Sequence, residues 1–206
     1  MNVTIRSVIV DFGDVLFRTE DPNGRRRWER LLGLPSGDLA RLVFESEVGG
    51  QSMVGRATEA DVWQHVADTF SLDDETLGQF IRDFWSGDRL DTELVEFVRS
   101  LRPRYRTAIL SDAWPGVRDV FTQMFGLDTA VDEIIISAEE GIAKPDPRVF
   151  RIAAERLGVR PQEAVFVDDR PDNVQGARAV GMRGIQFETR EQTIADVRKY
   201  LEGVSP

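Results

Sequence analysis

Short hydrophobic runs recur along the chain and are separated by stretches with helical periodicity. The runs are rich in β-branched and aromatic residues and do not alternate with polar ones, which is typical of strands buried on both faces of a parallel sheet. They occupy residues 7–10, 107–110, 133–136, 164–167 and 184–187. Strands that alternate with helices in this way predict a doubly wound α/β fold built on a parallel sheet.

Three helices around the later strands have recognisable positions. Asp146 precedes a proline, a pair that opens a helix expected to end near Gly158. Asp172 is expected to cap another helix, which stops at Gly181. A further helix at about 91–102 leads into the second strand.

About ninety residues separate the first predicted strand from the second, too many for one crossover helix. This stretch predicts four short helices and no strand, with the helices at residues 24–32, 36–46, 59–70 and 74–85. Thr58 and Asp61 resemble a capping box at the start of the third. We interpret residues 17–87 as a helical cap domain over the carboxyl edge of the sheet. Residues 1–16 and 88–206 then form a discontinuous α/β core domain.

Composition excludes several classes of function. The chain of 206 residues has no cysteine, which excludes disulfides, thiolate metal sites and cysteine nucleophiles. Its single histidine, His65, excludes a multi-histidine zinc site and would have to serve any serine–histidine triad. The net charge of −10 argues against a nucleic-acid partner, and the hydrophobic runs are far shorter than the ~20 residues that span a bilayer. An acidic residue as early as Asp11 argues against a signal peptide, so these features favour a cytoplasmic protein.

Polar side chains gather where the predicted strands end, which is where ligands bind in open α/β sheets. Those ends carry Asp11, Ser111, Asp168 and Asp169, and a nearby loop carries Lys144. Lysine is rare here, since 24 of the 26 basic residues are arginine, so Lys144 is unexpected. Clustered carboxylates need a hard cation such as Mg²⁺, and an ammonium with a hydroxyl suits a phosphate. The set predicts metal-assisted phosphoryl transfer to a carboxylate, giving an aspartyl-phosphate.

Four stretches of the sequence carry a family resemblance. They are VIVDFGDVLF, AILSDA, GIAKPDPRVF and VFVDDRPDNVQGARAVGM. In order and spacing they resemble the four motifs of the haloacid dehalogenase-like (HAD) hydrolase superfamily. The chain most resembles phosphatases with a helical cap after the first motif, including sugar-phosphate phosphatases whose first motif begins DLGN or DFGG. The resemblance covers the whole core, which it implies is Rossmann-like, and the cap by position and helical character.

The resemblance implies a nucleophile and a metal site. Asp11 would be the nucleophile and a ligand of Mg²⁺, and the backbone carbonyl of Gly13 would be a second ligand. Asp168 and Asp169 would complete the metal site, one of them directly and the other through water. The sequence leaves open which of the two binds directly.

The resemblance also implies a phosphate site. Ser111 and the backbone amide of Asp112 would hold the phosphoryl oxygens, and Lys144 would balance the negative charge of Asp11 and of the transition state. The family usually has asparagine where this chain has Asp112. An extra carboxylate there is expected to weaken phosphate binding unless it points away or meets an arginine such as Arg118.

A second departure concerns proton transfer. Most phosphatases of the family carry an aspartate two residues after the nucleophile, which protonates the leaving group, whereas this chain has Gly13. We expect that Asp14, one residue later, does not simply substitute. A missing general acid removes about 10²–10⁴-fold in rate, so we expect a preference for acyl phosphates, aryl phosphates or sugar 1-phosphates. Relatives that begin DLGN or DFGG also lack this aspartate, so its absence does not by itself exclude catalysis.

Other functions fit only parts of the same residue pattern. A dehalogenase would use Asp11 on a halogenated carbon without metal, and the paired carboxylates Asp168 and Asp169 oppose it. A phosphomutase needs the aspartate that Gly13 replaces, and a signalling receiver domain needs its acidic pair after the first strand. A non-catalytic relative that binds a metabolite or a partner protein is compatible with Gly13 and Asp112. The glycine motifs of nucleotide-binding modules do not occur in the sequence.

The remaining candidates are expected to be mainly structural. His65 is expected to be a surface or packing residue of the cap, and Trp28, Trp63 and Trp85 are expected to form the cap's core. Trp114, just past the second motif, is a weaker candidate for the pocket wall.

The sequence as a whole predicts a Mg²⁺-dependent phosphatase that acts on a small phosphorylated metabolite. We expect no nucleic-acid or membrane partner, and a monomer or homodimer. The substrate stays open, because the sequence does not show which cap residues face the site.

Overall fold

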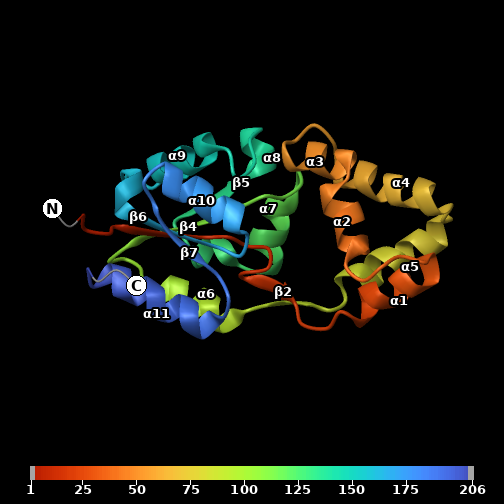
Figure 1. Ribbon diagram of the computed structural model, residues 1–206, viewed down its shortest axis with the longest axis horizontal. Coiled ribbons are helices and arrows are strands. Elements are labelled where there is room, and N and C mark those ends of the chain that lie inside the picture. Colours follow the sequence, from red (N-terminus) through yellow and green to blue (C-terminus); the bar gives the residue numbers. More distant parts are fainter. Residues whose placement is uncertain (1–2, 204–206) are drawn as a thin grey trace.

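The chain folds into two lobes (Figure 1). The computed structural model describes residues 3–203, so residues 1–2 and 204–206 of the predicted core lie outside the described part. One lobe contains a five-stranded sheet with helices on both faces, and the other consists of helices between residues 23 and 85. The parallel sheet and its flanking helices confirm the predicted fold class.

The large sheet is parallel at every pairing. Its strands are β1 (Ser7–Val10), β4 (Arg106–Ser111), β5 (Glu133–Ile136), β6 (Ala164–Asp168) and β7 (Arg183–Gln186). Their order is β5-β4-β1-β6-β7, so the first strand lies in the middle. Val8 pairs with Thr107 of β4 on one side and with Val165 of β6 on the other, and the three strands therefore end together. In doubly wound sheets that edge is where ligands bind.

Two hydrophobic layers hold helices against the sheet. Side chains of a strand alternate between its faces, so Val8 and Val10 pack into one layer and Ile9 packs into the other. The helices on the first face are α6 (Thr92–Ser100) and α11 (Arg190–Leu201), and those on the second are α9 (Pro147–Arg156) and α10 (Pro171–Ala179).

Of the two N-cap residues predicted for α9 and α10, one is confirmed and the other is wrong. Asp146 caps α9, where its side chain accepts a hydrogen bond from the backbone N–H of Arg148. The expectation that Asp172 caps α10 is wrong, because the N-cap residue is Arg170 and Asp172 lies in the first turn. The helix begins at Pro171, whose fixed φ and missing N–H suit the first helical position.

The second lobe contains one helix more than the sequence pattern predicts. Its helices are α1 (Asn23–Leu32), α2 (Asp38–Glu45), α3 (Glu47–Met53), α4 (Glu59–Phe70) and α5 (Asp74–Trp85). The unpredicted α3 contains Gly49 and Gly50, which have low helix propensity and obscure its pattern. The capping box of Thr58 and Asp61 at the start of α4 is confirmed.

A separate hydrophobic cluster holds these five helices together. It contains the buried side chains of Trp28, Trp63 and Phe80. The cluster also takes in Trp114, which comes from the loop after β4 in the sheet lobe. One aromatic side chain thus packs across the boundary between the two lobes.

The two chain connections between the lobes pair with each other as short strands. These are β2 (Phe17–Thr19) and β3 (Asp88–Leu90), which run antiparallel with Arg18 opposite Arg89. The expectation of no strand between residues 17 and about 90 is therefore wrong. Three residues are too few to show a hydrophobic alternation, and the partner strand lies far away in sequence.

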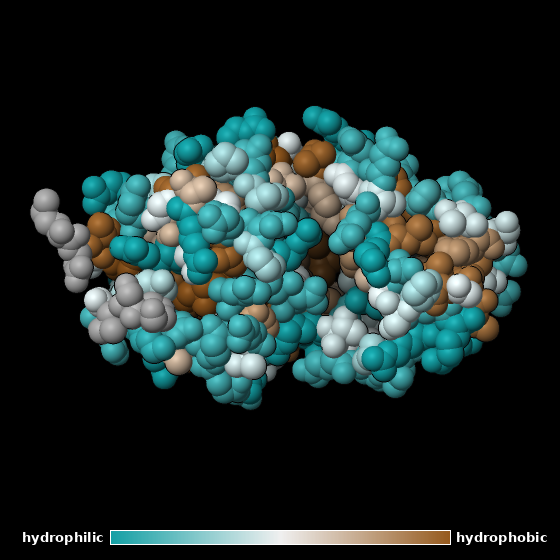
Figure 2. Space-filling model, in the orientation of Figure 1, coloured by the Kyte–Doolittle hydropathy of each residue, from teal (hydrophilic) through white to brown (hydrophobic). Residues whose placement is uncertain are grey.

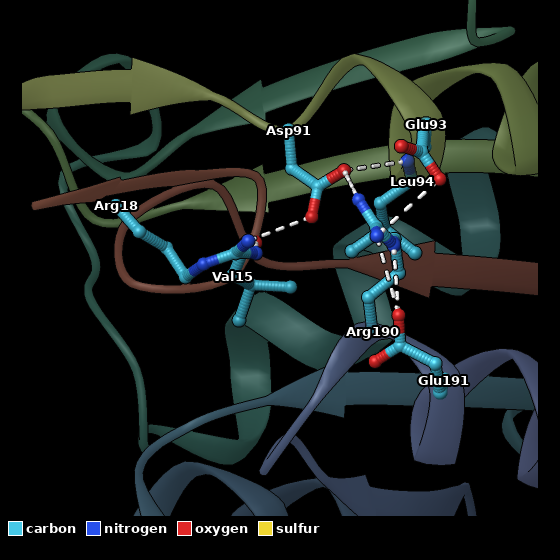
Figure 3. Close-up of polar contacts among 7 residues, drawn as sticks. All are labelled: Val15, Arg18, Asp91, Glu93, Leu94, Arg190 and Glu191. Carbon is cyan, nitrogen blue, oxygen red and sulfur yellow. Dashed lines mark hydrogen bonds and ion pairs between the residues drawn. The ribbon is translucent and has the colours of Figure 1, made fainter. Parts of the chain in front are cut away.

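A buried carboxylate ties this pair of connections to the sheet lobe (Figure 3). Asp91 follows β3, and its carboxylate lies 2.7 Å from Arg18 of β2 and 3.2 Å from Arg190 of α11. It also accepts the backbone N–H of Leu94 as the N-cap of α6. Burial opposes its ionisation, but the hydrogen bonds from Arg18, Leu94 and Arg190 hold the pKa of Asp91 below its ordinary value. Both entry and exit of the helical lobe are thereby anchored at one point.

The remaining elements are short connections. They are α7 (Val117–Asp119), the π-helical turn η1 (Val120–Met124), the 3₁₀ turns η2 (Leu127–Thr129) and η3 (Pro161–Glu163), and α8 (Ser137–Glu140). Within residues 3–203, no helix has both the length and the apolar composition needed to cross a membrane.

Replacing Asp91 by asparagine should lower the free energy of unfolding by about 2 kcal/mol at neutral pH, because two arginines lose their charged partner. The folded-state pKa of Asp91 lies below its unfolded value of about 3.9, so its contribution is complete above that value. It is lost as the pH falls through the folded-state pKa. Urea unfolding of both proteins at neutral pH and at pH values well below ~3.9 measures the difference.

The matched control is Asp73→Asn, which alters another N-cap aspartate that accepts a backbone N–H but has no arginine partner among the described residues. Asparagine caps helices about as well as aspartate, so this change should have little effect. A penalty for Asp91→Asn that stays constant into acid would contradict the ion-pair account.

Candidate active site

The carboxyl ends of three neighbouring strands bring predicted site residues together. Asp11 directly follows β1, Ser111 is the last residue of β4, and Asp168 is the last residue of β6. All three are buried. The backbone N–H of Asp11 donates to the carbonyl of Val167 at 2.9 Å, which fixes the end of β1 against that of β6.

Lys144 joins two of these carboxylates from the loop between α8 and α9. Its Nζ lies 2.7 Å from Oδ1 of Asp11 and 2.7 Å from Oδ2 of Asp168. Nζ also donates to the carbonyl of Leu110 at 3.2 Å. Burial opposes the charge of this ammonium, but the carboxylates of Asp11 and Asp168 raise the pKa of Lys144, so it stays protonated at neutral pH.

Asp11 is oriented by two donors on the same oxygen. Its Oδ1 accepts the backbone N–H of Phe12 at 2.7 Å in addition to the contact with Lys144. Oδ2 of Asp11 accepts no hydrogen bond from the described residues. Burial raises the pKa of this carboxyl, Lys144 opposes that rise, and the charge of Asp168 adds to it.

Asp168 is completely enclosed and fully hydrogen-bonded. Oδ1 accepts the backbone N–H of Arg170 at 2.9 Å and Nδ2 of Asn173 at 3.0 Å. Oδ2 accepts Nζ of Lys144 at 2.7 Å and the same Nδ2 of Asn173 at 3.1 Å. Both oxygens of Asp168 therefore already have two donors each.

Asp169 completes an acidic cluster with Asp11 and Asp168. One carboxylate oxygen of each lies within 4.8 Å of the other two. Burial, followed by the charges of Asp168 and Asp14, raises the pKa of Asp169 to about 6. Three carboxylates beside one ammonium leave excess negative charge, and a donor set made only of oxygens suits a hard divalent cation. The residues present thus fit a Mg²⁺ ion.

Asp112 supports the loop that carries Lys144. Its Oδ1 accepts the backbone N–H of Lys144 at 3.0 Å, and burial raises the pKa of its carboxyl. Arg118 does not meet this carboxylate, because its guanidinium pairs with Glu139 at 2.5 Å. The suggestion that Arg118 offsets Asp112 is therefore wrong.

A cavity of about 430 Å³ opens next to the carboxyl end of β4. Its wall includes Ser111 and Asp112 from the sheet lobe, together with Phe44 of α2 and Trp85 of α5 from the helical lobe. Trp114, the weaker candidate for the pocket wall, lines it as well. Figure 2 shows the hollow between the lobes, with hydrophobic side chains in its depth and hydrophilic ones around it.

The turn after Asp11 leaves the position of the missing aspartate open. Gly13 lines the cavity, and no atom outside its chain neighbours lies within 4 Å of the place where a Cβ would stand. Asp14 follows in the left-handed conformation, with φ at 54°. Asp14 is not among the described residues that line the cavity. This geometry agrees with the expectation that Asp14 does not replace the missing general acid.

The other residues singled out in the sequence lie in the helical lobe. Trp28 and Trp63 are buried in its hydrophobic cluster as expected, while Trp85 is only half-buried and reaches the cavity. His65 lines a separate, open hollow with Glu47 and Arg56.

Three residues of the site and its cavity were not predicted from the sequence. Asn173 donates hydrogen bonds to both oxygens of Asp168. It lies five residues after Asp168, in the first turn of α10, and this spacing could have identified it from the sequence. Phe44 and Met53 line the cavity, but nothing in their sequence distinguishes them from other apolar cap residues.

Comparison with known proteins gives a match over most of the chain. A family model described as a haloacid dehalogenase-like hydrolase matches residues 5–181. Drimenol cyclase drtB of Aspergillus calidoustus is 27% identical over 192 residues, which cover 91% of this chain and 35% of that protein. A glyceraldehyde 3-phosphate phosphatase of Methanopyrus kandleri is 48% identical over 58 residues, or 28% of this chain and 25% of that protein. The chain thus matches well under two thirds of the length of these relatives.

A third relative and two solved structures are matched over more of their own length. (S)-2-haloacid dehalogenase 1 of a Pseudomonas species is 29% identical over 168 residues, which cover 75% of this chain and 73% of that protein. A HAD-like family hydrolase from Porphyromonas gingivalis superposes with a TM-score of 0.76 at 23% identity, covering 97% of this chain and 98% of the other. A HAD family enzyme from Bacteroides thetaiotaomicron, in complex with magnesium and inorganic phosphate, superposes with a TM-score of 0.73 at 19% identity, covering 89% and 94%. At these identities the structural likeness establishes the fold.

Proposed function

The chain belongs to the haloacid dehalogenase-like hydrolase family, and from that premise we propose that it is a Mg²⁺-dependent phosphatase. Its substrate would be a small phosphorylated metabolite, hydrolysed through an aspartyl-phosphate on Asp11. The observation that carries the proposal is the position of Nζ of Lys144, 2.7 Å from both Asp11 and Asp168, beside a third carboxylate. A fixed ammonium next to an acidic cluster suits a dianionic phosphate held with a divalent cation.

Asp11 is oriented to act as the nucleophile. Because Phe12 and Lys144 both contact Oδ1, Oδ2 is the oxygen left to attack phosphorus. Attack forms an O–P bond to Asp11 while the bond from phosphorus to the ester oxygen breaks, and the ester oxygen leaves as an alkoxide or phenolate that takes a proton from water. A water molecule then attacks the acyl phosphate, which releases inorganic phosphate and restores the carboxylate.

Lys144 and Ser111 would hold the transferring group. Lys144 has three fixed contacts, so its ammonium is already aimed at the place where negative charge develops beside Asp11. Ser111 and Asp112 line the neighbouring cavity, where the Ser111 hydroxyl and the backbone amide of Asp112 would donate to the phosphoryl oxygens.

The acidic cluster would hold the Mg²⁺, which when bound neutralises the carboxylates and polarises a phosphoryl oxygen. Asp11 and the carbonyl of Gly13 would bind it, together with Asp169, whose carboxylate accepts no hydrogen bond from another described residue. Asp168 has two donors on each oxygen, so we assign it to the outer position, where it positions Lys144. We therefore propose Asp169 as the direct ligand of the pair.

A second candidate is a dehalogenase, favoured by the relative that matches 75% of the chain. Asp11 would then attack a carbon and expel a halide ion. That reaction has no use for three carboxylates within 4.8 Å of one another, which supports the phosphatase.

Phosphate release tests the proposal. We expect release from acetyl phosphate, 4-nitrophenyl phosphate or a sugar 1-phosphate that EDTA abolishes and Mg²⁺ restores. Asp11→Asn keeps the shape of the side chain but removes the nucleophile, and should lower kcat by about 10³-fold or more. Halide release from 2-chloropropionate without metal, and no phosphate release, would support the dehalogenase instead.

The assignment of the two neighbouring aspartates predicts different defects. Asp169→Asn should raise the Mg²⁺ concentration for half-maximal activity by about 10–100-fold, because a ligand is weakened. Asp168→Asn should change that concentration much less and lower kcat instead, because Lys144 loses a charged partner. Titration of activity with Mg²⁺, and calorimetric Mg²⁺ binding, measure both. The reverse pattern would show that Asp168 is the direct ligand.

Gly13→Asp should supply the missing general acid, since the backbone leaves room for a side chain there. We expect kcat for an alkyl phosphate to rise by about 10²-fold and kcat for 4-nitrophenyl phosphate to change little, because nitrophenolate leaves without a proton. Gly13→Asn is the matched control, with the same shape and no acid. An equal effect of both variants on both substrates would mean that proton transfer does not limit the reaction.

A further inference from the structure

The cavity beside the acidic cluster has a different chemical character from the cluster itself. At about 430 Å³ it lies within the range of about 300–1,000 Å³ that is typical of small-molecule sites. Its lining includes Ser111, Asp112 and the two residues that follow Asp11 in the chain, Phe12 and Gly13. A group that leaves from a phosphorus atom at Asp11 would therefore occupy this space.

Aromatic rings from both lobes form much of its wall. Phe44 and Trp114 have ring centroids 5.7 Å apart, and Trp85 lies 6.2 Å from Trp114. Phe12 and Phe125 of the sheet lobe also line the cavity, with ring centroids 6.0 Å apart. Rings that meet in this way offer flat, apolar contact surface to a ligand.

Few polar groups of the wall are free to bind a ligand. Glu59 and Asp112 are the charged side chains among the described lining residues. Glu59 accepts Nε1 of Trp63 at 2.9 Å, and Asp112 accepts the backbone N–H of Lys144. Hydroxyl groups of a sugar would lose water in this cavity without gaining enough partners, which is unfavourable.

The apolar surface continues to the rim of the cavity. The π-helical turn η1 buries Phe121 and exposes Val120 and Met124, whose residues are 37% and 71% accessible. All three line the cavity. Methionine adapts to irregular apolar ligands, and single π-turns occur frequently at functional sites.

We propose that this cavity binds the leaving group, and that the substrate is the phosphate ester of a phenol or another apolar, ring-containing alcohol. The inference rests on the proposed phosphatase function and specifies its substrate class. An apolar leaving group gains from burial against the aromatic wall. A phenolate also leaves without the proton that Gly13 cannot supply. The sugar phosphates that the sequence resemblance suggests fit this wall poorly.

The test compares two phosphates whose phenols have similar acidity, 1-naphthyl phosphate and 4-acetamidophenyl phosphate. Acetyl phosphate, which is too small to fill the cavity, reports on the reaction itself. We expect kcat/KM for the naphthyl ester to exceed that for the acetamido ester by about tenfold or more. Equal values for the two esters, with acetyl phosphate still hydrolysed, would overturn the inference and leave the phosphatase function standing.

A variant at the rim links the preference to this cavity. Met124→Glu places a charge at an exposed apolar position, so it should fold normally and lower the ratio of naphthyl to acetyl phosphate kcat/KM about fivefold or more. Leu31→Glu is the matched control, because Leu31 is also exposed, at 64%, and does not line the cavity. An unchanged ratio in Met124→Glu would place the leaving group elsewhere.

Binding separates the inference from failure of the phosphatase function. Calorimetric titration of Asp11→Asn with the two aryl phosphates measures affinity without turnover, and 1-naphthyl phosphate should bind about tenfold more tightly. If none of the three phosphates is hydrolysed by the unaltered protein, the proposed function fails. Tighter naphthyl binding would then still support an apolar cavity, and equal or absent binding would overturn it.

Discussion

Burial of one ammonium among carboxylates is the interaction on which the site depends. Lys144 and its two partners, Asp11 and Asp168, are each at most 7% exposed. Charges removed from water in this way are unfavourable unless they are paired and their remaining hydrogen bonds are made. Here Leu110 and Asn173 make those bonds. The arrangement therefore fixes three side chains from separate strands and loops in one geometry, before any substrate binds.

The parallel sheet explains why so much of the site could be predicted from the sequence. Each strand run ends at a polar residue, and parallel strands bring their carboxyl ends to one edge, so Asp11, Ser111 and Asp168 could be placed together without a structure. The helical lobe gave weaker signals. The helix around Gly49 was missed because its glycines weaken the pattern, and the strands around Arg18 and Arg89 were missed because their pairing is long-range. Asp172 was misassigned because proline, rather than a capping side chain, fixes the start of its helix.

The parts of the site that could not be predicted are those that depend on how the two lobes meet. Phe44 and Trp85 reach the cavity only because the helical lobe is held in one orientation, by Trp114 within its hydrophobic cluster and by Asp91 at its connections. The sheet lobe contributes the charged cluster and part of the apolar wall, and the helical lobe completes that wall with Phe44 and Trp85. In the proposed function, the charged cluster would hold the phosphate and the apolar wall between the lobes would select the group attached to it.

The covalent intermediate is the most direct test of this account. Protein quenched during turnover of an aryl phosphate with Mg²⁺ can be treated with borohydride, which reduces an aspartyl-phosphate to homoserine. Peptide mass spectrometry should find homoserine at position 11 and at no other aspartate, and only when substrate and metal are both present. Homoserine at another position, or turnover with no reduced residue, would contradict the role of Asp11 on which the account is built.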